Sequence, residues 1–247
     1  MAKGRKMNRY LVSFDFWNTI VTNVSYKKRR LALIREFLKE RGFDRSADEI
    51  QNAYGSIRDR IKQNKMHEEN KYTDLEERMA VVLGGLNVSY ERSMALELID
   101  VLQRPVWDDP PPLIQEIVDI LRYLSAFSDI ACISDTGMTK GTTIRGIMEW
   151  YGIDQYFRCH VFSEDIGRNK PDGRMFYPLL HNEEGIPKEQ IFHVGDLFDT
   201  DVVGATNCGI NAIWYVNQPN EIKEMHGGSN VMIITSLAQI RDILRGD

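Results

Sequence analysis

The chain has 247 residues, of which 43% are hydrophobic and 27% are charged, so its length fits one large domain or a core with a smaller insert. Its formal net charge of −5 excludes a general attraction to nucleic acid or to anionic membranes. No apolar stretch reaches the ~20 residues that a membrane helix needs, and residues 1–9 lack the apolar region of a secretory signal. The three cysteines, Cys132, Cys159 and Cys208, are too widely spaced for a disulfide framework or a zinc site, so we expect a cytoplasmic protein.

The first predicted element is a buried strand over Tyr10–Phe14, which ends at Asp15. The next stretch, residues 24 to 105, has the periodicity of successive helices and contains no convincing strand. The expected helices are 25–41, 46–66, 73–83 and 89–103. Capping boxes are predicted to open two of them, Ser46 with Glu49 and Thr73 with Glu76. A stiff connector of three prolines follows at 110–112.

From residue 113 onward, predicted helices alternate with predicted strands. The helices cover 113–126, 139–151 with Thr139 as a plausible N-cap, 173–184, 200–207 and 236–244. The strands cover 129–134, 159–163, 191–194, 210–216 and 231–234. Near-continuous apolar strands between helices predict an α/β fold with a parallel sheet covered on both faces. We therefore expect an α/β core made of 1–22 and 109–247, with an all-helical domain, 23–108, inserted after the first strand.

Polar residues follow three of the predicted strands at the point where each strand ends. They are Asp15, Ser134 and Asp196. Because parallel sheets bind ligands at the carboxyl ends of their strands, we expect these side chains to converge on one edge. The helical insert follows the first strand, so we expect it to cover that edge as a lid.

Four segments in order carry a resemblance to a known family. They are Asp15-Phe16-Trp17-Asn18-Thr19, Ile133-Ser134-Asp135-Thr136-Gly137, Asn169-Lys170-Pro171-Asp172, and Val194-Gly195-Asp196 with Asp201 after it. Together they resemble the four motifs of the haloacid dehalogenase-like (HAD) superfamily, most of whose members are Mg-dependent phosphatases. The resemblance covers essentially the whole chain. It implies a Rossmann-like α/β core and an α-helical cap between the first and second motifs.

The resemblance also implies a role for each polar residue. Asp15 would be the nucleophile that forms an aspartyl-phosphate, which divides one hard displacement into two easier ones. Phosphate-binding residues would be Thr19, Ser134, Asp135 and Lys170, with Asp135 shaping the cradle and Lys170 balancing the nearby anions. Mg²⁺ would be held by Asp15, the backbone carbonyl of Trp17, Asp196 and Asp201, with Asp199 a possible contributor. Taken singly, these residues would be read as turn, capping or solvated residues, and only the four segments in order favour the functional interpretation.

Trp17 departs from the phosphatase pattern. The superfamily's phosphatases have a second Asp two residues after the first, which protonates the leaving oxygen and then activates water. Such general acid–base catalysis contributes roughly 10²–10⁴-fold, and a Trp side chain provides neither function. Its backbone carbonyl remains able to bind a metal.

Three functions are therefore open. The first is a phosphatase for small phosphorylated molecules that tolerates the loss or recruits another acid, for which His67, Glu68 and Glu69 are candidates, although such a cluster is usually a solvated turn. The second is a 2-haloacid dehalogenase, since these relatives carry an aromatic residue at the same place but need no metal and lack the acidic residue at Asp196. The third is a non-catalytic module that binds phosphate and metal. His193 lies in a predicted strand, where we expect a packed core histidine, and the sequence leaves the oligomeric state open.

Overall fold

The computed structural model describes residues 10–181, 185–216 and 229–245. The chain divides into two compact units. One is the α/β unit, made of the described residues of Met1–Asn23, Pro112–Asp135 and Met148–Asp247, and the other is the helical unit, made of Val24–Pro111 and Thr136–Ile147. The helical unit thus includes residues 136–147 in addition to a stretch close to the expected insert. The expected domain boundaries at 22 and 108 stay a prediction.

The α/β unit is built on a six-stranded parallel sheet with the strand order β3-β2-β1-β4-β5-β6. The strands are β1 (Tyr10–Phe14), β2 (Ser128–Ser134), β3 (Cys159–Phe162), β4 (Ile191–Gly195), β5 (Asn211–Tyr215) and β6 (Val231–Ile234). Each lies within about one residue of a predicted strand. The α/β parallel-sheet prediction is confirmed.

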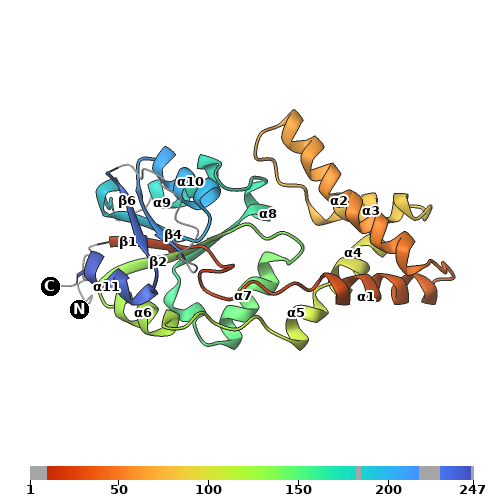
Figure 1. Cartoon of the computed structure of the whole chain (residues 1–247), viewed down its shortest axis with the longest axis horizontal. Coiled ribbons are helices and arrows are strands. Elements are labelled where there is room, and N and C mark those ends of the chain that lie inside the picture. The colour runs from red at the N-terminus through yellow and green to blue at the C-terminus, as the bar shows by residue number, and fades with distance from the viewer. Residues whose placement is uncertain (1–9, 182–184, 217–228, 246–247) are drawn as a thin grey trace, which may run out of the picture. The chain divides into compact units, whose positions relative to one another are not determined.

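Helices cover both faces of this sheet (Figure 1). On one face, α6 (Ile117–Leu124) and α11 (Ile240–Ile243) lie together, and on the other lie α9 (Tyr177–Leu180) and α10 (Val203–Asn207). The remaining elements of this unit are η1 (Asp154–Tyr156), α8 (Ser163–Ile166), η2 (Gly173–Phe176), η3 (Lys188–Gln190), η4 (Phe198–Val202) and η6 (Leu237–Gln239), and α7 (Gly141–Trp150) spans the two units. Alternate strand residues such as Leu11, Ile133 and Ile191 join one apolar cluster with residues of α9 and α10. Burial on both faces explains why the strands are apolar along their whole length.

Several predicted helices of this unit are shorter than expected. Residues 173–184 were expected to form one helix, but the chain forms the 3₁₀ turn η2 and then the short helix α9, while residues 182–184 lie outside the described residues. Pro178 lies in the first turn of α9 and lacks the N–H that a continuous helix would use there. Residues 200–207 are likewise divided between the π-helical turn η4 and α10.

The helical unit contains α1 (Lys27–Glu40), α2 (Ala47–His67), α3 (Leu75–Gly85), α4 (Arg92–Val101) and α5 (Arg104–Asp108). Its core is formed by apolar residues at helical spacing, such as Ile34 with Leu38 and Met79 with Leu83. The capping box at Ser46 is confirmed, because the Glu49 N–H donates to Ser46 Oγ over 3.2 Å and the Ser46 N–H donates to Glu49 Oε2 over 2.8 Å.

The other predicted caps are wrong. The N-cap of α3 is Asp74, whose carboxylate accepts from the Glu77 N–H over 2.7 Å. Thr73 is engaged elsewhere, since its hydroxyl accepts from Asn64 over 2.9 Å. Thr139 lies two residues before α7, and its hydroxyl accepts from Arg30 instead. Aspartate and threonine are both good N-cap residues. For α3, the contact of Thr73 with Asn64 therefore leaves the N-cap position to Asp74.

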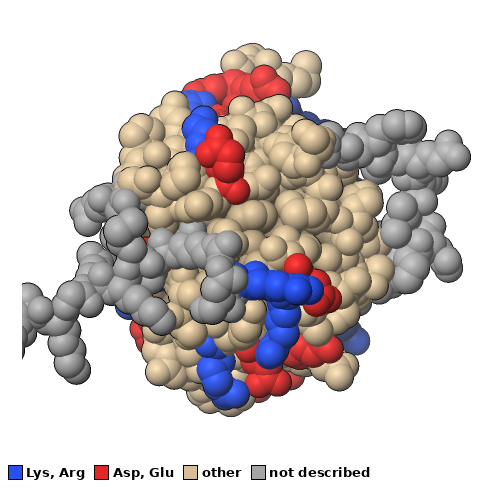
Figure 2. All heavy atoms as spheres, turned by 90° about the vertical axis from the view of Figure 1, so that its left-hand side faces the viewer, with Lys and Arg blue, Asp and Glu red and all other residues tan. Residues whose placement is uncertain are grey.

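The described residues contain no helix that is both long and apolar enough to span a membrane. Figure 2 shows one face of the molecule, on which Lys and Arg side chains lie beside Asp and Glu side chains. The described part of this face carries no broad patch of a single sign.

Candidate active site

The loop after β1 places Asp15 at the edge of the sheet. The Asp15 N–H donates to the Val194 carbonyl over 2.8 Å, so the backbone pairing of β1 with β4 extends to the aspartate. A tight turn follows, in which the N–H groups of Ile20 and Val21 both donate to the Phe16 carbonyl. Asn18 has a φ of 56° in this turn, a left-handed conformation that asparagine tolerates better than most residues. The turn fixes the direction in which Asp15 leaves the strand.

The end of β4 is shaped by close packing between a glycine and a carboxylate. A Cβ atom at Gly195 would lie 2.3 Å from Asp201 Cγ, so no larger residue fits there. The backbone carbonyl of the next residue, Asp196, accepts from Trp214 Nε1 over 2.9 Å. Glycine therefore allows Asp201 to approach β4, while the Trp214 bond holds the Asp196 backbone.

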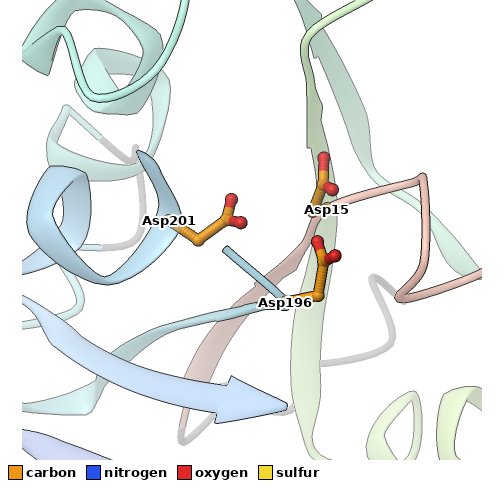
Figure 3. A group of neighbouring side chains, drawn as sticks. All are labelled: Asp15, Asp196 and Asp201. Atoms are coloured by element: carbon orange, nitrogen blue, oxygen red, sulfur yellow. The ribbon is translucent and has the colours of Figure 1, made fainter. Parts of the chain in front are cut away.

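Three carboxyl groups meet at this edge of the sheet. Asp15, Asp196 and Asp201 each offer an oxygen atom, and these atoms lie within 4.8 Å of one another. Figure 3 shows them arriving from the end of β1, the end of β4 and the η4 turn, with the carboxyl groups turned toward a common space. Asp199, the other acidic candidate in this segment, is exposed and lies outside the group.

Lys170 lies between two of these carboxylates. Its Nζ donates to Asp15 Oδ1 over 2.7 Å and to Asp201 Oδ1 over 2.5 Å, and also to the Ile133 carbonyl. The side chain is buried, with 4% of the residue's surface exposed. The Asp135 carboxylate accepts from the Lys170 backbone N–H over 3.0 Å. Asp135 thus fixes the backbone of the lysine, and its expected contact with phosphate stays a prediction.

Hydrogen bonds occupy most of the acceptor positions of Asp201. Oδ1 faces Lys170 Nζ and also His193 Nε2, which lies 3.0 Å away. Oδ2 accepts from the Leu197 N–H over 3.0 Å. Each carboxylate oxygen has two lone pairs, so one lone pair on Oδ2 remains for a further ligand. Burial opposes ionisation of Asp201, but Lys170 and His193 outweigh it and hold the pKa of this carboxyl below its usual range.

His193 is a packed core residue, as expected, but it is also part of the site. It is 1% exposed, and its ring lies edge-on to Phe176. Its two ring nitrogens face Asp201 Oδ1 and Ser13 Oγ. Sequence reasoning missed this contact. The spacing within β4, which puts His193 on the same face as Ile191 and Gly195, was the available signal.

Asn18 is a second residue that sequence reasoning missed. Its Nδ2 donates to Asp196 Oδ2 over 3.0 Å, and its Oδ1 accepts from the Asn23 N–H. Burial raises the pKa of Asp196, although the Asn18 hydrogen bond partly offsets this. The amide therefore orients a carboxylate without supplying a charge to neutralise it.

The charges of this cluster are unbalanced. Three carboxylates face the single ammonium of Lys170, which leaves a surplus of two negative charges when all are ionised. Burial, with a further contribution from the Asp201 charge, raises the pKa of Asp15 to about 8, although Lys170 opposes the shift. Burial alone would lower the pKa of Lys170, but the charges of Asp15 and Asp201 raise it instead. A divalent cation with a preference for oxygen ligands fits this donor set and would offset the surplus.

Two buried hydroxyl groups at the carboxyl ends of β1 and β2 have no hydrogen-bond partner among the described residues. Thr19 Oγ1 and Ser134 Oγ are buried, and neither makes a hydrogen bond within the described residues. Thr19 lies in the turn after β1, and Ser134 ends the neighbouring strand β2. Lys170 Nζ donates to the carbonyl of Ile133, the residue before Ser134. Buried polar groups are normally satisfied, so two unpaired donors at this edge of the sheet suit a bound anion.

Trp17 occupies the position of the missing acid. It is partly exposed, and its ring lies edge-on to Phe16 with a centroid distance of 4.9 Å. The alternative acids expected from the insert lie at the end of α2, where Glu68 faces Lys71 at 3.9 Å. They belong to the helical unit, so their proposed role as acids stays a prediction.

Comparison with known proteins adds a family and several relatives. A family model described as haloacid dehalogenase-like hydrolase matches residues 12–215. The glyceraldehyde 3-phosphate phosphatase of Methanothermobacter thermautotrophicus is 33% identical over 115 residues, which are 43% of this chain and 49% of that protein. The pyrimidine 5'-nucleotidase PynA of Streptococcus pneumoniae is 33% identical over 79 residues, 31% of this chain and 33% of that protein. The matches thus span between a third and a half of these curated relatives.

Solved structures share the fold over nearly the whole chain. The HAD hydrolase YfnB from Bacillus subtilis, bound to magnesium, has a TM-score of 0.62 at 18% identity, with 96% of this chain and 100% of that chain covered. A 2-haloacid dehalogenase from Pseudomonas syringae pv. tomato has a TM-score of 0.70 at 20% identity, with coverages of 95% and 97%. At this level of identity the likeness shows the fold.

Proposed function

Because the chain belongs to the haloacid dehalogenase-like hydrolase family, we propose that it is a Mg²⁺-dependent phosphatase for a small phosphorylated molecule. The observation that carries the proposal is a pair of buried hydroxyls, Thr19 and Ser134, which have no hydrogen-bond partner among the described residues. They lie at the ends of β1 and β2, at the sheet edge where a buried lysine pairs with two of three clustered carboxylates. The names of the phosphatase and nucleotidase relatives support the same reaction class. The free cysteines among the described residues favour a reducing compartment such as the cytoplasm.

The phosphate group would be bound by donors that the protein leaves unused. Thr19 and Ser134 each supply a hydroxyl, and Lys170 supplies positive charge from a position fixed by Asp15 and Asp201. Buried donors aimed at an anion need no reorganisation when charge develops on it. This arrangement favours a tetrahedral oxyanion over a neutral substrate.

The cation would be held by oxygen ligands from the same edge. Asp15 and Asp196 have acceptor positions that the protein leaves open, the Trp17 carbonyl is the third candidate, and Asp201 has one lone pair left for a direct or water-mediated contact. When bound, Mg²⁺ would neutralise charge on the carboxylates and the phosphate and polarise the phosphoryl group.

Asp15 would act as the nucleophile through Oδ2. Its Oδ1 accepts from Lys170, whereas Oδ2 accepts no hydrogen bond within the described residues. An Oδ2 lone pair forms the new bond to phosphorus while the bond from phosphorus to the leaving oxygen breaks. Water then attacks the phosphoaspartate, which releases inorganic phosphate and restores the carboxylate. The Lys170 ammonium favours the ionised form of Asp15, and a bound cation would add to this effect before the first step.

The leaving group would depart without help from Trp17. No proton donor replaces the missing carboxyl at this position, and His193 is committed to Asp201 and Ser13. The enzyme should therefore prefer substrates whose leaving oxygen is stable as an anion. Activated esters are expected to turn over much faster than alkyl phosphates.

An activity test with three substrates checks this proposal. Purified protein is given p-nitrophenyl phosphate, an alkyl phosphate and a 2-haloacid, each with Mg²⁺ and with a chelator. We expect Mg²⁺-dependent hydrolysis of the aryl ester, weak hydrolysis of the alkyl ester and no halide release. Asp15→Asn should reduce turnover by about 10⁴-fold or more, because an amide is a poor nucleophile. Trp17→Asp should raise alkyl phosphate turnover by roughly 10²-fold if the acid is all that is missing.

Two other functions are separated by the same assay. A dehalogenase is favoured by the aromatic Trp17, and halide release in the presence of chelator would establish it. The cluster of three carboxylates at this edge of the sheet argues against it, because a metal-free site would keep the surplus negative charge. A non-catalytic phosphate-binding module would bind Mg²⁺ and phosphate yet hydrolyse none of the substrates.

A further inference from the structure

A chain of hydrogen bonds runs through the sheet to the candidate nucleophile. Ser13 Oγ lies 2.8 Å from His193 Nδ1, and His193 Nε2 lies 3.0 Å from Asp201 Oδ1. The same oxygen accepts from Lys170 Nζ, which also donates to Asp15 Oδ1 over 2.7 Å. Ser13 and His193 are register partners on β1 and β4, so the two central strands fix the first link.

The number of protons that Asp201, His193 and Ser13 carry determines which atom donates and which accepts in each hydrogen bond of the chain. An ionised Asp201 only accepts, so His193 Nε2 must carry a proton and donate it. The His193 ring is only 1% exposed and packs edge-on against Phe176, surroundings in which a neutral ring is favoured over an imidazolium. In the neutral ring Nδ1 has a lone pair, and it accepts from the Ser13 hydroxyl. The alternative, in which Nδ1 donates and Ser13 donates to the Phe192 carbonyl at 3.2 Å, would require a buried imidazolium.

The position of Asp201 determines where the lysine ammonium lies. Lys170 Nζ is shared between Asp201 and Asp15, so a rotation of the Asp201 carboxylate would move the charge away from the nucleophile. The Leu197 N–H holds Oδ2, and His193 holds Oδ1. With one donor on each oxygen in addition to the lysine, the carboxylate has a single favourable orientation.

We propose that His193, oriented by Ser13, is a positioning residue that fixes Asp201 and thereby holds Lys170 against Asp15. This rests on the proposed function of Asp15 as nucleophile. His193 neither touches the substrate nor exchanges protons with it. Its effect is on how fast Asp15 reacts rather than on how tightly the substrate binds.

A second histidine–aspartate pair provides a matched control. His160 Nε2 lies 2.9 Å from Asp154 Oδ1, and His160 is on strand β3, at an edge of the same sheet. Its ring lies between Phe157 and Phe162. This pair likewise sets a histidine ring nitrogen close to an aspartate oxygen within the same sheet, but it makes no bond to Lys170. A general loss of packing should affect both pairs, whereas a positioning role belongs to His193 alone.

Steady-state kinetics on p-nitrophenyl phosphate with Mg²⁺ test the role. We expect His193→Leu to lower kcat by roughly 10–100-fold, as is common when a residue that orients a functional group is lost, with KM changed by less than about threefold. His193→Gln keeps an N–H donor near the Nε2 position and should recover most of kcat. His160→Gln should leave both constants unchanged. Equal kcat for wild type and His193→Leu, or an equal loss in His160→Gln, would overturn the proposal.

An NMR measurement on ¹⁵N-histidine-labelled protein tests the hydrogen bond without any turnover. We expect the His193 ring to be the neutral tautomer with its proton on Nε2, and Ser13→Ala to weaken this preference and lower kcat a fewfold. A proton on Nδ1 in wild type would contradict the proposal, even where His193→Leu does not fold. A wild type that hydrolyses no phosphate ester would instead refute the proposed function, and the NMR result would still show whether His193 donates to Asp201.

Discussion

Two halves of one site differ in how completely their polar groups are used. In the closed half, Lys170, Asp201 and His193 are buried and bonded to one another. In the open half, the hydroxyls of Thr19 and Ser134 and one oxygen of Asp15 accept or donate no hydrogen bond among the described residues, and Asp196 Oδ2 is held by Asn18 alone. The difference separates positioning from binding: saturated groups set geometry, and unsaturated groups are available for ligands.

The two halves share Asp15, so each depends on the other. Lys170 reaches Asp15 Oδ1 from the closed half, and Asp15 Oδ2 accepts no hydrogen bond within the described residues. Buried polar groups are costly unless they are paired. The closed half satisfies its groups within the protein, whereas the open half should become fully satisfied only when a cation and a phosphate bind.

The largest expected effect comes from breaking the closed half. Lys170→Gln would remove the ammonium group that pairs with two buried carboxylates, Asp15 and Asp201. Removing one partner of a buried ion pair typically costs about 3–5 kcal/mol of folding free energy. We expect a loss of this size in chemical denaturation, together with loss of detectable phosphatase activity.

A lysine outside the site serves as the control for that variant. Lys188 is exposed, and its Nζ donates to the Cys208 carbonyl over 2.8 Å. Lys188→Gln should change the unfolding free energy by no more than about 0.5 kcal/mol. If both variants had equal stability, the closed half would not be held together by Lys170.

Variants of the open half should have smaller effects. They should weaken phosphate binding and leave stability equal or slightly higher, whereas the closed-half variant loses stability. Ser134→Ala and Thr19→Val remove hydroxyls that have no partner in the protein, so thermal stability should stay equal or rise slightly. Inhibition by inorganic phosphate should weaken by roughly 5–10-fold for each, the equivalent of one hydrogen bond of about 1 kcal/mol.

The hydroxyl of Thr206 gives the matched comparison. It donates to the carbonyl of Val202, the last residue of η4, over 2.8 Å and has no proposed ligand. Thr206→Val should therefore lower stability modestly and leave phosphate inhibition unchanged. Stability losses for Ser134→Ala as large as for Thr206→Val would show that Ser134 is a structural residue.

Much of the open half could be predicted from the sequence, and the reason is geometric. Asp15, Ser134 and Asp196 each follow an apolar run, and parallel strands deliver their ends to one edge of the sheet. The order of the four motifs along the chain indicated which chemical role each of these residues could have. Recognising the strands was therefore enough to predict that these three residues lie close together.

The closed half was only partly predictable. A histidine within an apolar strand looks like a packed residue, and His193 is one. Its second role depends on Asp201, which the irregular η4 turn carries back against Gly195. Neither periodicity nor residue spacing specifies such a turn. The wrong cap at Thr73 has a similar origin, because Asn64 of another helix engages its hydroxyl.

The most direct test of this division is the pH dependence of the unfolding free energy, measured with and without Mg²⁺. The pKa of Asp15 is raised from 3.8 to about 8 in the folded protein, so between these values the folded state holds a proton that the unfolded chain has released. The metal-free protein should therefore lose stability as pH rises through this range, by up to about 1.4 kcal/mol per pH unit. In the proposed site Mg²⁺ would bind the ionised carboxylates and should flatten or reverse that decline, and Asp15→Asn should reduce it without metal. Identical pH profiles with and without Mg²⁺ would contradict the claim that the open half is a cation site.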